Sequence, residues 1–267
     1  MRLGFIGAGK MATAIAKGAV SAGICTPVEL TGSGRSAETR ERFEAETGGG
    51  TTTSDNDAVF IRSEIVFLCV KPADACATLR RHAPAIRECP FVVSVAAGVA
   101  LADLQAAAGP DVAVVRSMPN TPCLVGKGAT AYARGASVTD AQAAEVERVF
   151  AAVGDVHAVP ENLIDAVNGL SGSGPAYVYL VIEALADGGV LMGLPRKLAA
   201  SLAAQTVLGA AASVQGTGRH PAELREAVAS PGGTTMAALE SLERAGARAA
   251  FIGAVRAATE RARELGR

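Results

Sequence analysis

The chain has few aromatic residues and little charge of either sign. Of its 267 residues 4% are aromatic, none is Trp, and only 19% are charged. Because 25 basic and 26 acidic residues nearly cancel, the composition predicts neither a nucleic-acid-binding face nor a membrane-surface patch. Hydrophobic residues make up 49% of the chain, which is typical of a globular protein with an ample core. The length predicts two domains.

Cysteine is scarce and scattered. The five cysteines lie in the first half without CxxC spacing, at Cys25, Cys69, Cys76, Cys89 and Cys123. An odd, scattered set predicts free thiols in a reducing compartment, with no metal site and no disulfide. Met1 is followed almost at once by an apolar run, so we expect no secretory leader and a cytoplasmic protein. The apolar run 175–194 contains Glu183 and Asp187, which argue against a membrane span.

Short apolar runs alternate with helical periods in the first part of the chain. The expected strands are residues 3–6, 28–31, 65–70, 91–95 and 112–116. Helical spacing falls between them, most clearly over residues 10–22, 35–46, 73–83 and 101–107. This alternation indicates βαβ units and a parallel, doubly wound sheet. We therefore predict an α/β protein whose residues 1–160 form a Rossmann-type NAD(P)-binding domain.

The pattern changes near Pro160. From there only helical periods appear, and Pro175, Pro195 and Pro221 each stand where a first helical turn would begin. Residues 161–267 are therefore predicted to be all-α. The expected helix 175–192 is apolar nearly all round and needs cover on every side. A domain of this size can hardly supply that cover, which predicts a helical dimer interface.

A glycine-rich turn after the first strand predicts a dinucleotide site. Gly7 would form the tight turn, Gly9 would let the backbone approach a pyrophosphate, and Ala12 is small enough for helix–strand packing. The second strand is followed by residues 32–36 without the acidic residue that usually holds the ribose of NAD. Ser33, Arg35 and Ser36 could instead hold a 2′-phosphate. This predicts NADPH, with NADH as the alternative.

Residues 230–235, here called the GGTT turn, interrupt the helical half. Pro231 and two glycines precede Thr234 and Thr235, which lead into an amphipathic run. The turn predicts a helix start whose uncovered amide groups could bind a carboxylate.

The usual acid–base groups for alcohol oxidation are missing. His82, His157 and His220 each fit a solvated surface position, and no lysine occurs between Lys127 and Lys197. A protonated imine is already electrophilic, so its reduction needs mainly a cofactor, orientation and an anion-binding group.

With these features the chain resembles pyrroline-5-carboxylate reductase, the last enzyme of proline biosynthesis. The resemblance covers essentially the whole chain. It rests on GFIGAGKMA at the start, VKP at 70–72, AAGV at 96–99, MPNTP at 118–122, GLSGSGPAYVY at 169–179, ADGGVLMGLPR at 186–196 and LREAVASPGGTTMAALESLE at 224–243.

The resemblance implies NAD(P)H-dependent reduction of L-1-pyrroline-5-carboxylate to L-proline, with hydride delivered to imine carbon C5. Thr235 would be the catalytic residue, as hydrogen-bond partner and proton donor to the ring nitrogen. Substrate binding would fall to Glu161, Ser230, Gly232, Gly233, Thr234 and Thr235. Cofactor binding would fall to Gly7, Ala8, Gly9, Lys10, Met11, Ala12, Ser33, Gly34, Arg35, Asn56, Cys69, Val70, Lys71, Pro72, Ala96 and Ala97. Intertwined homodimers are implied, with a decamer built from dimers as an alternative.

Several simpler interpretations remain open. Thr234 and Thr235 could be ordinary helix caps. Glu161 could merely favour the start of the helix that follows. Residues 119–122 predict a rigid turn, which either faces the nicotinamide or is purely structural. Some relatives carry an amide side chain where this chain has Ala227, so a cofactor or pocket contact made by that amide could be missing here. Another imine reductase and a non-catalytic NADPH sensor are the competing functions.

Overall fold

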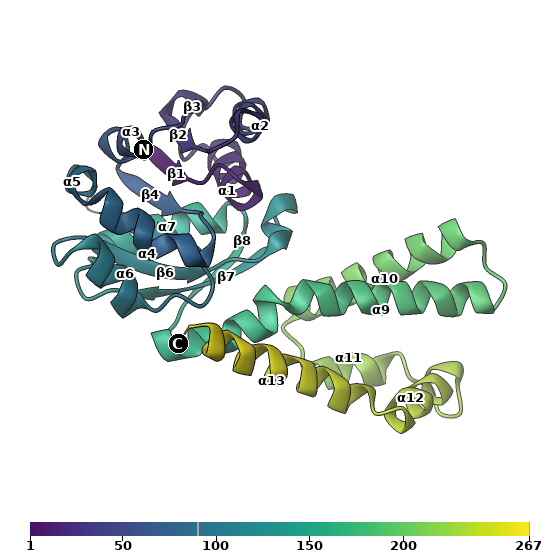
Figure 1. Ribbon diagram of the computed structural model, residues 1–267. Coiled ribbons are helices and arrows are strands. Elements are labelled where there is room, and N and C mark those ends of the chain that lie inside the picture. Colours follow the sequence, from purple (N-terminus) through teal and green to yellow (C-terminus); the bar gives the residue numbers. More distant parts are fainter. Residues whose placement is uncertain (90, 267) are drawn as a thin grey trace. The chain divides into compact units, whose positions relative to one another are not determined.

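The computed structural model describes residues 1–89 and 91–266 (Figure 1). The chain forms two compact units. The first, called the sheet unit, comprises Met1–Ser173 together with Ala257–Arg267, and the second, the helical unit, comprises Gly174–Arg256. The predicted fold class, a Rossmann-type sheet domain followed by helices, is confirmed. The two compact units are separated after Ser173. The predicted boundary at 160/161 marks the change in sequence pattern instead.

The sheet unit contains one eight-stranded sheet of order β3-β2-β1-β4-β5-β6-β7-β8. All neighbours are parallel except β6 and β7. The strands are β1 Leu3–Ile6, β2 Leu30–Ser33, β3 Thr51–Thr53, β4 Ile65–Leu68, β5 Phe91–Ser94, β6 Ala113–Met118, β7 Gly128–Arg134 and β8 Gly154–Ala158. Strand order reverses between β1 and β4, which places a crevice at the carboxyl ends of these strands.

Helices cover both faces of this sheet. They are α1 Lys10–Ser21, α2 Ala37–Thr47, α3 Asn56–Arg62, α4 Pro72–Arg81, α5 Ala83–Ile86, α6 Leu101–Ala108, α7 Asp140–Ala151 and α8 Ile164–Val167. Alternate strand residues define two cores. Phe5 and Phe67 pack with residues of α1, α2 and α7, whereas Val66 and Leu68 pack with those of α3 to α6. Figure 1 shows α4 and α6 on one face, with α7 on the other.

Two differences from the predicted strands have local causes. The second strand was expected at 28–31 but spans Leu30–Ser33, because Pro27–Glu29 forms a 3-10 turn capped by Thr26. The strands β3 and β7 were not predicted. The first has only three residues, all threonine, and the second mixes small and polar residues, so neither shows a clear apolar alternation.

The chain leaves the sheet through an irregular helical segment. Pro160 is followed by a 3-10 turn at Glu161–Leu163, then α8, then a π-helical segment at Asn168–Gly172. Ile164 of α8 packs against Ala131 and Ala133 of β7. This packing is why residues 161–173 belong to the sheet unit.

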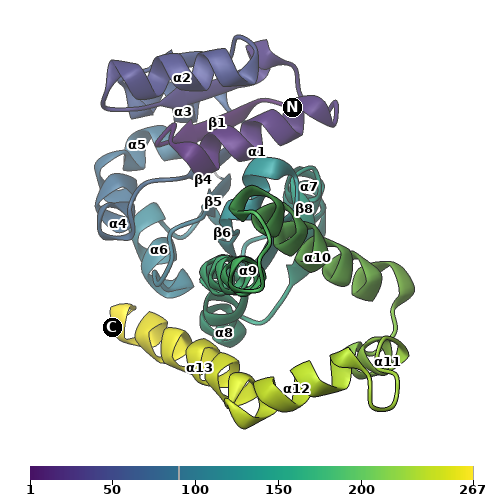
Figure 2. The ribbon, with the colours of Figure 1, turned by 90° about the vertical axis from the view of Figure 1, so that its right-hand side faces the viewer.

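The helical unit contains the predicted helices. They are α9 Gly174–Leu191, α10 Arg196–Thr217, α11 Pro221–Ala227, α12 Thr234–Arg244 and the first part of α13 Ala247–Leu265. Helices α9 and α10 lie side by side (Figures 1 and 2). Their contact is built on Ala186, Ala199 and Ala203. A reversal at Gly193, with φ +96°, precedes Pro195 at the start of α10.

Among the described residues one helix, α10, has the length and apolar composition of a membrane span, and 11% of its apolar window is buried in this chain. A helix with the length and composition of α10 can equally be one whose exposed face is covered by another protein surface.

Candidate functional site: a cleft in the sheet unit and a turn in the helical unit

The glycine turn between β1 and α1 is held by its own backbone. Gly7 has φ +93°, and a Cβ there would lie 2.7 Å from the Cys69 carbonyl oxygen, so only glycine fits. The amides of Gly7 and Ala8 donate to the Ser33 carbonyl at 3.0 and 2.6 Å. The ends of β1, β2 and β4 are therefore joined at one point.

Helix α1 begins directly after this turn. Gly9 is its N-cap and contributes no side-chain cap, and Ala12 is fully buried against the sheet. The amides of Lys10, Met11 and Ala12 have no hydrogen-bond partner among the described residues. Unpaired amides at the positive end of a helix fit a pyrophosphate.

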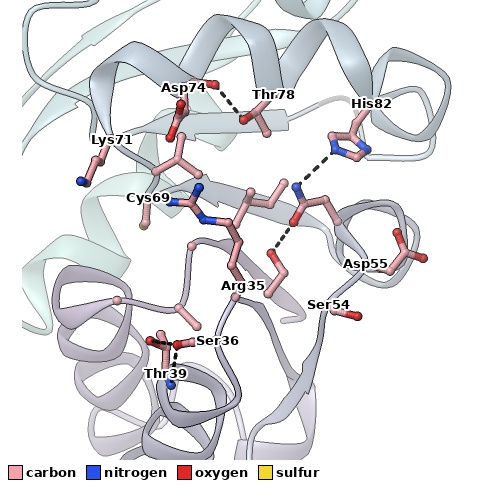
Figure 3. Close-up of a pocket in the computed structure, with 18 of the residues that line it drawn as sticks. Arg35, Ser36, Thr39, Ser54, Asp55, Cys69, Lys71, Asp74, Thr78 and His82 are labelled. Atoms are coloured by element: carbon pink, nitrogen blue, oxygen red, sulfur yellow. Dashed lines mark hydrogen bonds between the residues drawn. The ribbon is translucent and has the colours of Figure 1, made fainter.

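A cleft of about 980 Å³ opens at this crevice (Figure 3). It brings together ten of the predicted cofactor residues: Gly7, Ala8, Gly9, Ser33, Gly34, Arg35, Asn56, Cys69, Val70 and Lys71. Six others do not line it: Lys10, Met11, Ala12, Pro72, Ala96 and Ala97. Their cofactor role remains a prediction.

Ser36, predicted as a possible 2′-phosphate ligand, also lines the cleft. The remaining lining residues have no predicted cofactor role. They are Ile6, Thr39, Ser54, Asp55, Asp74, Ala77, Thr78, Arg81 and His82. Four of these, at positions 74, 77, 78 and 81, follow helical spacing along α4. Once Pro72 is taken as the start of a helix at the sheet edge, this periodicity could have identified the face.

Arg35 stands at the mouth of the cleft after β2. Its side chain extends into the cleft in Figure 3, and no ion pair in the described part of the chain includes it. Arg40 holds the Arg35 loop by donating to the Gly34 carbonyl at 2.7 Å. Ser36 caps α2 by accepting from the Thr39 amide at 3.3 Å. An exposed guanidinium beside a helix start is suited to bind a phosphate.

The expectation that His82 is a solvated surface residue is wrong. Its side chain is only 15% exposed. The ring nitrogens contact Asp57 Oδ1 at 2.7 Å and Asn56 Nδ2 at 3.3 Å, and the ring lies near Phe60. No sequence pattern linked His82 to Asn56, because the contact joins the end of α4 to the start of α3.

Cys69 is the one thiol predicted in the site. Burial raises its pKa to about 12, so the thiol stays protonated at neutral pH. A neutral, half-buried thiol contributes packing rather than nucleophilic chemistry.

Residues 119–122 have structural contacts, and the alternative that this turn faces the nicotinamide remains a prediction. Asn120 donates to the Ser171 carbonyl at 3.0 Å and accepts from the Ala129 amide at 2.9 Å. The turn therefore ties β7 to the π-helical segment. Nearby, Ala96 is buried and its amide donates to Ser94 Oγ at 3.3 Å.

Glu161 is bound within the sheet unit. Its carboxylate accepts from the Leu101 amide at 2.6 Å and from Arg116 at 3.1 Å. Arg116 is buried and also binds Asp165 at 2.7 Å. The carboxylate thus occupies the start of α6, not that of its own helix. Its predicted substrate contact remains a prediction.

The GGTT turn has the backbone predicted for an anion site. Gly232 has φ +69°, and the Gly233 amide donates to the Ser230 carbonyl at 3.0 Å. Gly233 occupies the N-cap of α12 and offers no side chain, so the interpretation of the threonines as caps is wrong. Among the described residues the amides of Thr234 and Thr235 have no partner. Two amides and two hydroxyls are therefore available to a ligand.

The fold and the cleft define a dinucleotide-dependent oxidoreductase. Residues 2–98 match the family described as "NADP oxidoreductase coenzyme F420-dependent". Residues 161–265 match the family described as "Pyrroline-5-carboxylate reductase dimerisation". The chain belongs to the pyrroline-5-carboxylate reductase family.

Relatives and solved structures support this assignment over the full length. The chain is 47% identical to pyrroline-5-carboxylate reductase of Glycine max, covering 98% of this chain and 95% of that protein. It is 46% identical to the enzyme of Synechocystis, covering 100% and 99%. The Coxiella burnetii structure has a TM-score of 0.92 at 36% identity, covering 100% and 98%. The Plasmodium falciparum structure, solved with NADP bound, has a TM-score of 0.88 at 32% identity, covering 100% and 98%.

Proposed function

We propose that this chain reduces L-1-pyrroline-5-carboxylate to L-proline with NADPH as hydride donor. The observation that carries the proposal is the GGTT turn, in which the amides of Thr234 and Thr235 have no partner among the described residues. The same chain has a dinucleotide cleft and matches a pyrroline-5-carboxylate reductase over 98% of its length. Two features support NADPH: β2 ends without an acidic residue, and Arg35 lies at the cleft without an ion-pair partner among the described residues. The Plasmodium relative was solved with NADP bound.

The GGTT turn would hold the substrate by its carboxylate. The amides of Thr234 and Thr235 would donate to the carboxylate oxygens at the start of α12, where the helix dipole favours negative charge. The Thr235 hydroxyl would hydrogen-bond the ring nitrogen and keep a proton on it. When bound, the cofactor supplies one hydride. With the hydride on C5 and the proton on nitrogen, the product is the neutral secondary amine of proline.

The sheet unit would hold the nucleotide. The amides of Lys10, Met11 and Ala12, which have no partner in the described part of the chain, fit the pyrophosphate, and Arg35 fits the 2′-phosphate. The cleft side chains offer little for alcohol oxidation: the Cys69 thiol is protonated, and His82 is hydrogen-bonded to neighbours. Reduction of an imine, which needs no general base, agrees with this inventory.

We further propose that the protein is a cytoplasmic homodimer. A decamer built from such dimers is the alternative assembly. The chain carries a dimerisation domain. Support for a close dimer comes from the exposed apolar side chains of the helical unit, including Leu180, Leu185 and Leu202. Five free cysteines fit a reducing compartment. Nucleic acid and membrane are not expected partners, because the charges nearly cancel and the apolar helices would face a second copy.

A steady-state assay tests the function. Pyrroline-5-carboxylate should oxidise NADPH with stoichiometric formation of L-proline, and NADH should be used less well. The same assay with a six-membered cyclic imino acid tests the competing imine reductase. No nucleotide oxidation with the five-membered substrate, despite tight NADPH binding, would remove the proposed reaction.

A further inference from the structure

Four polar side chains form a hydrogen-bonded chain along one wall of the cleft. Asp57 Oδ1 lies 2.7 Å from His82 Nδ1, and His82 Nε2 lies 3.3 Å from Asn56 Nδ2. Asn56 Oδ1 then accepts from Ser33 Oγ at 2.6 Å. The last two bonds are dashed in Figure 3. The chain joins α4, α3 and β2, and its last member stands where the ribose 2′ position is read in this fold.

The direction of each hydrogen bond follows from its partners. Asp57 can only accept, so Nδ1 of a neutral His82 carries the proton. Nε2 is then an acceptor for the Asn56 amide NH₂. The Asn56 oxygen is left facing Ser33, so the Ser33 hydroxyl donates to it. In this state Ser33 offers the cleft a lone pair and no proton.

The imidazole ring is well held. It lies at the carboxyl end of α4, with its centroid 6.5 Å from that of buried Phe60, and Asp57 fixes the opposite edge. Ser33 is equally fixed, since its carbonyl accepts from the Gly7 and Ala8 amides. Asn56 between them can respond by turning its side-chain amide.

Protonation of His82 reverses the pattern. Nε2 gains a proton and becomes a donor, which then faces the donor NH₂ of Asn56. The amide must turn by half a rotation, so that its oxygen accepts from His82 and its NH₂ donates to Ser33 Oγ. The Ser33 proton is then released from Asn56 and can point into the cleft.

We propose that His82 is a positioning residue for nucleotide selectivity, which sets the direction of the Ser33 hydroxyl through Asn56. The proposal rests on the proposed function, in that the cleft takes NADPH or NADH. With neutral His82 the Ser33 lone pair suits the ribose hydroxyl of NADH and repels a phosphate oxygen. With protonated His82 the Ser33 hydroxyl donates to the 2′-phosphate of NADPH. Selectivity for NADPH therefore increases as pH falls.

The charged groups around His82 come from three elements. They are Asp57 on α3, which contacts the ring, with Asp55 before it, Asp74 and Arg81 on α4, and Arg35 after β2. Helix α5 presents no titratable side chain within Ala83–Ile86. Imidazole is the side chain that ordinarily changes charge between pH 5 and 8.

Direct binding of NADP⁺ and NAD⁺ to the intact protein, measured by calorimetry from pH 5.5 to 8.5, tests this proposal. The His82→Gln variant cannot protonate, so its profile records the titration of the phosphate alone. Relative to that variant, the wild-type preference for NADP⁺ should rise about tenfold from pH 8.5 to 5.5, as expected for one hydrogen bond to a charged group. Parallel profiles for the two proteins would overturn the proposal.

Two further variants sharpen the measurement. His157→Gln is the matched control, since His157 also contacts an aspartate but is 64% exposed on β8 and does not line the cleft. It should keep the wild-type profile. In a Ser33→Ala background, His82→Gln should no longer alter the profile. A persistent effect there would contradict transmission through Ser33. If His82→Gln does not fold, His82→Phe, which keeps a ring beside Phe60, replaces it.

The outcomes separate this inference from the proposed function. Binding of neither nucleotide would defeat both. Nucleotide binding with the expected pH dependence, but no reduction of pyrroline-5-carboxylate, would defeat the reaction and leave the role of His82 standing.

Discussion

The two units of this chain bury their apolar residues in opposite ways. In the described sheet unit the largest fully buried side chains include Tyr132 and five phenylalanines. In the described helical unit the buried hydrophobic residues are three alanines: Ala186, Ala199 and Ala203. That same unit exposes fifteen large apolar side chains: Val178, Tyr179, Leu180, Leu185, Leu191, Met192, Leu194, Leu198, Leu202, Leu208, Val228, Met236, Leu242, Phe251 and Ile252.

The contrast shows that one unit has a large core of its own, whereas the other has a small alanine cluster between α9 and α10. Burying a leucine side chain contributes about 1.5–3 kcal/mol, which the helical unit forgoes at many positions. A second copy of the chain would recover it, as the match to a dimerisation domain indicates. The division extends to chemistry, because the nucleotide cleft lies in the unit with the large core and the GGTT turn in the unit with the small one.

The largest expected effect comes from charging the exposed face of the helical unit. Leu180 on α9 is 64% exposed. Leu180→Glu should weaken dimerisation about a thousandfold, because each copy loses an apolar contact and places a charge in the interface. Light scattering and the reductase assay measure assembly and activity together. Val28→Glu, at an 81% exposed position of the sheet unit, is the matched control and should leave both unchanged. An intact, active Leu180→Glu dimer would contradict the interface.

The next effect tests the core of the sheet unit. Arg116→Ala leaves the carboxylates of Glu161 and Asp165 without their buried partner. We expect a loss of about 3–5 kcal/mol in the free energy of unfolding, measured with urea. The control Arg134→Ala removes a pair with the exposed Asp140 and should cost about 1 kcal/mol or less. Equal losses of unfolding free energy in the two variants would show that the burial of Arg116 does not add to its contribution to stability.

A smaller effect concerns the GGTT turn. Thr235→Ala should lower kcat about a hundredfold, because the ring nitrogen loses its hydrogen-bond partner. The affinity for NADPH, which depends on the other unit, should stay the same. Thr234→Ala keeps both backbone amides and should lose much less. Turnover unchanged in Thr235→Ala would remove this residue from the mechanism.

The smallest expected effect lies at the mouth of the cleft. Arg35→Ala should raise the KM for NADPH about tenfold and barely alter that for NADH, because only NADPH carries a 2′-phosphate. Arg62→Ala on α3, which is exposed and outside the cleft, is the control. The same rise for both nucleotides would defeat the assignment of Arg35 to the phosphate.

Much of the helical unit could be predicted because its boundaries are local. Pro195 stands before α10 and Gly233 before α12, and each acts through its own backbone. The glycine turn was equally predictable, because the spacing of Gly7, Gly9 and Ala12 directly after an apolar run is itself a sequence signal. The predicted strand at 28–31 was placed two residues early, because Pro27–Glu29 forms a 3-10 turn in which the Glu29 carboxylate accepts from the Thr26 amide and hydroxyl.

Local backbone preferences and apolar periodicity are properties of neighbouring residues, so the amino-acid sequence alone specified the Rossmann-type unit, the helices and the GGTT turn. The environment of a polar side chain depends on residues far along the chain, which only folding brings together. His82 meets Asn56, and Arg116 meets Glu161, through contacts between separate elements. For that reason the wall of the cleft, and the engagement of Glu161 at the start of α6, emerged from the three-dimensional structure.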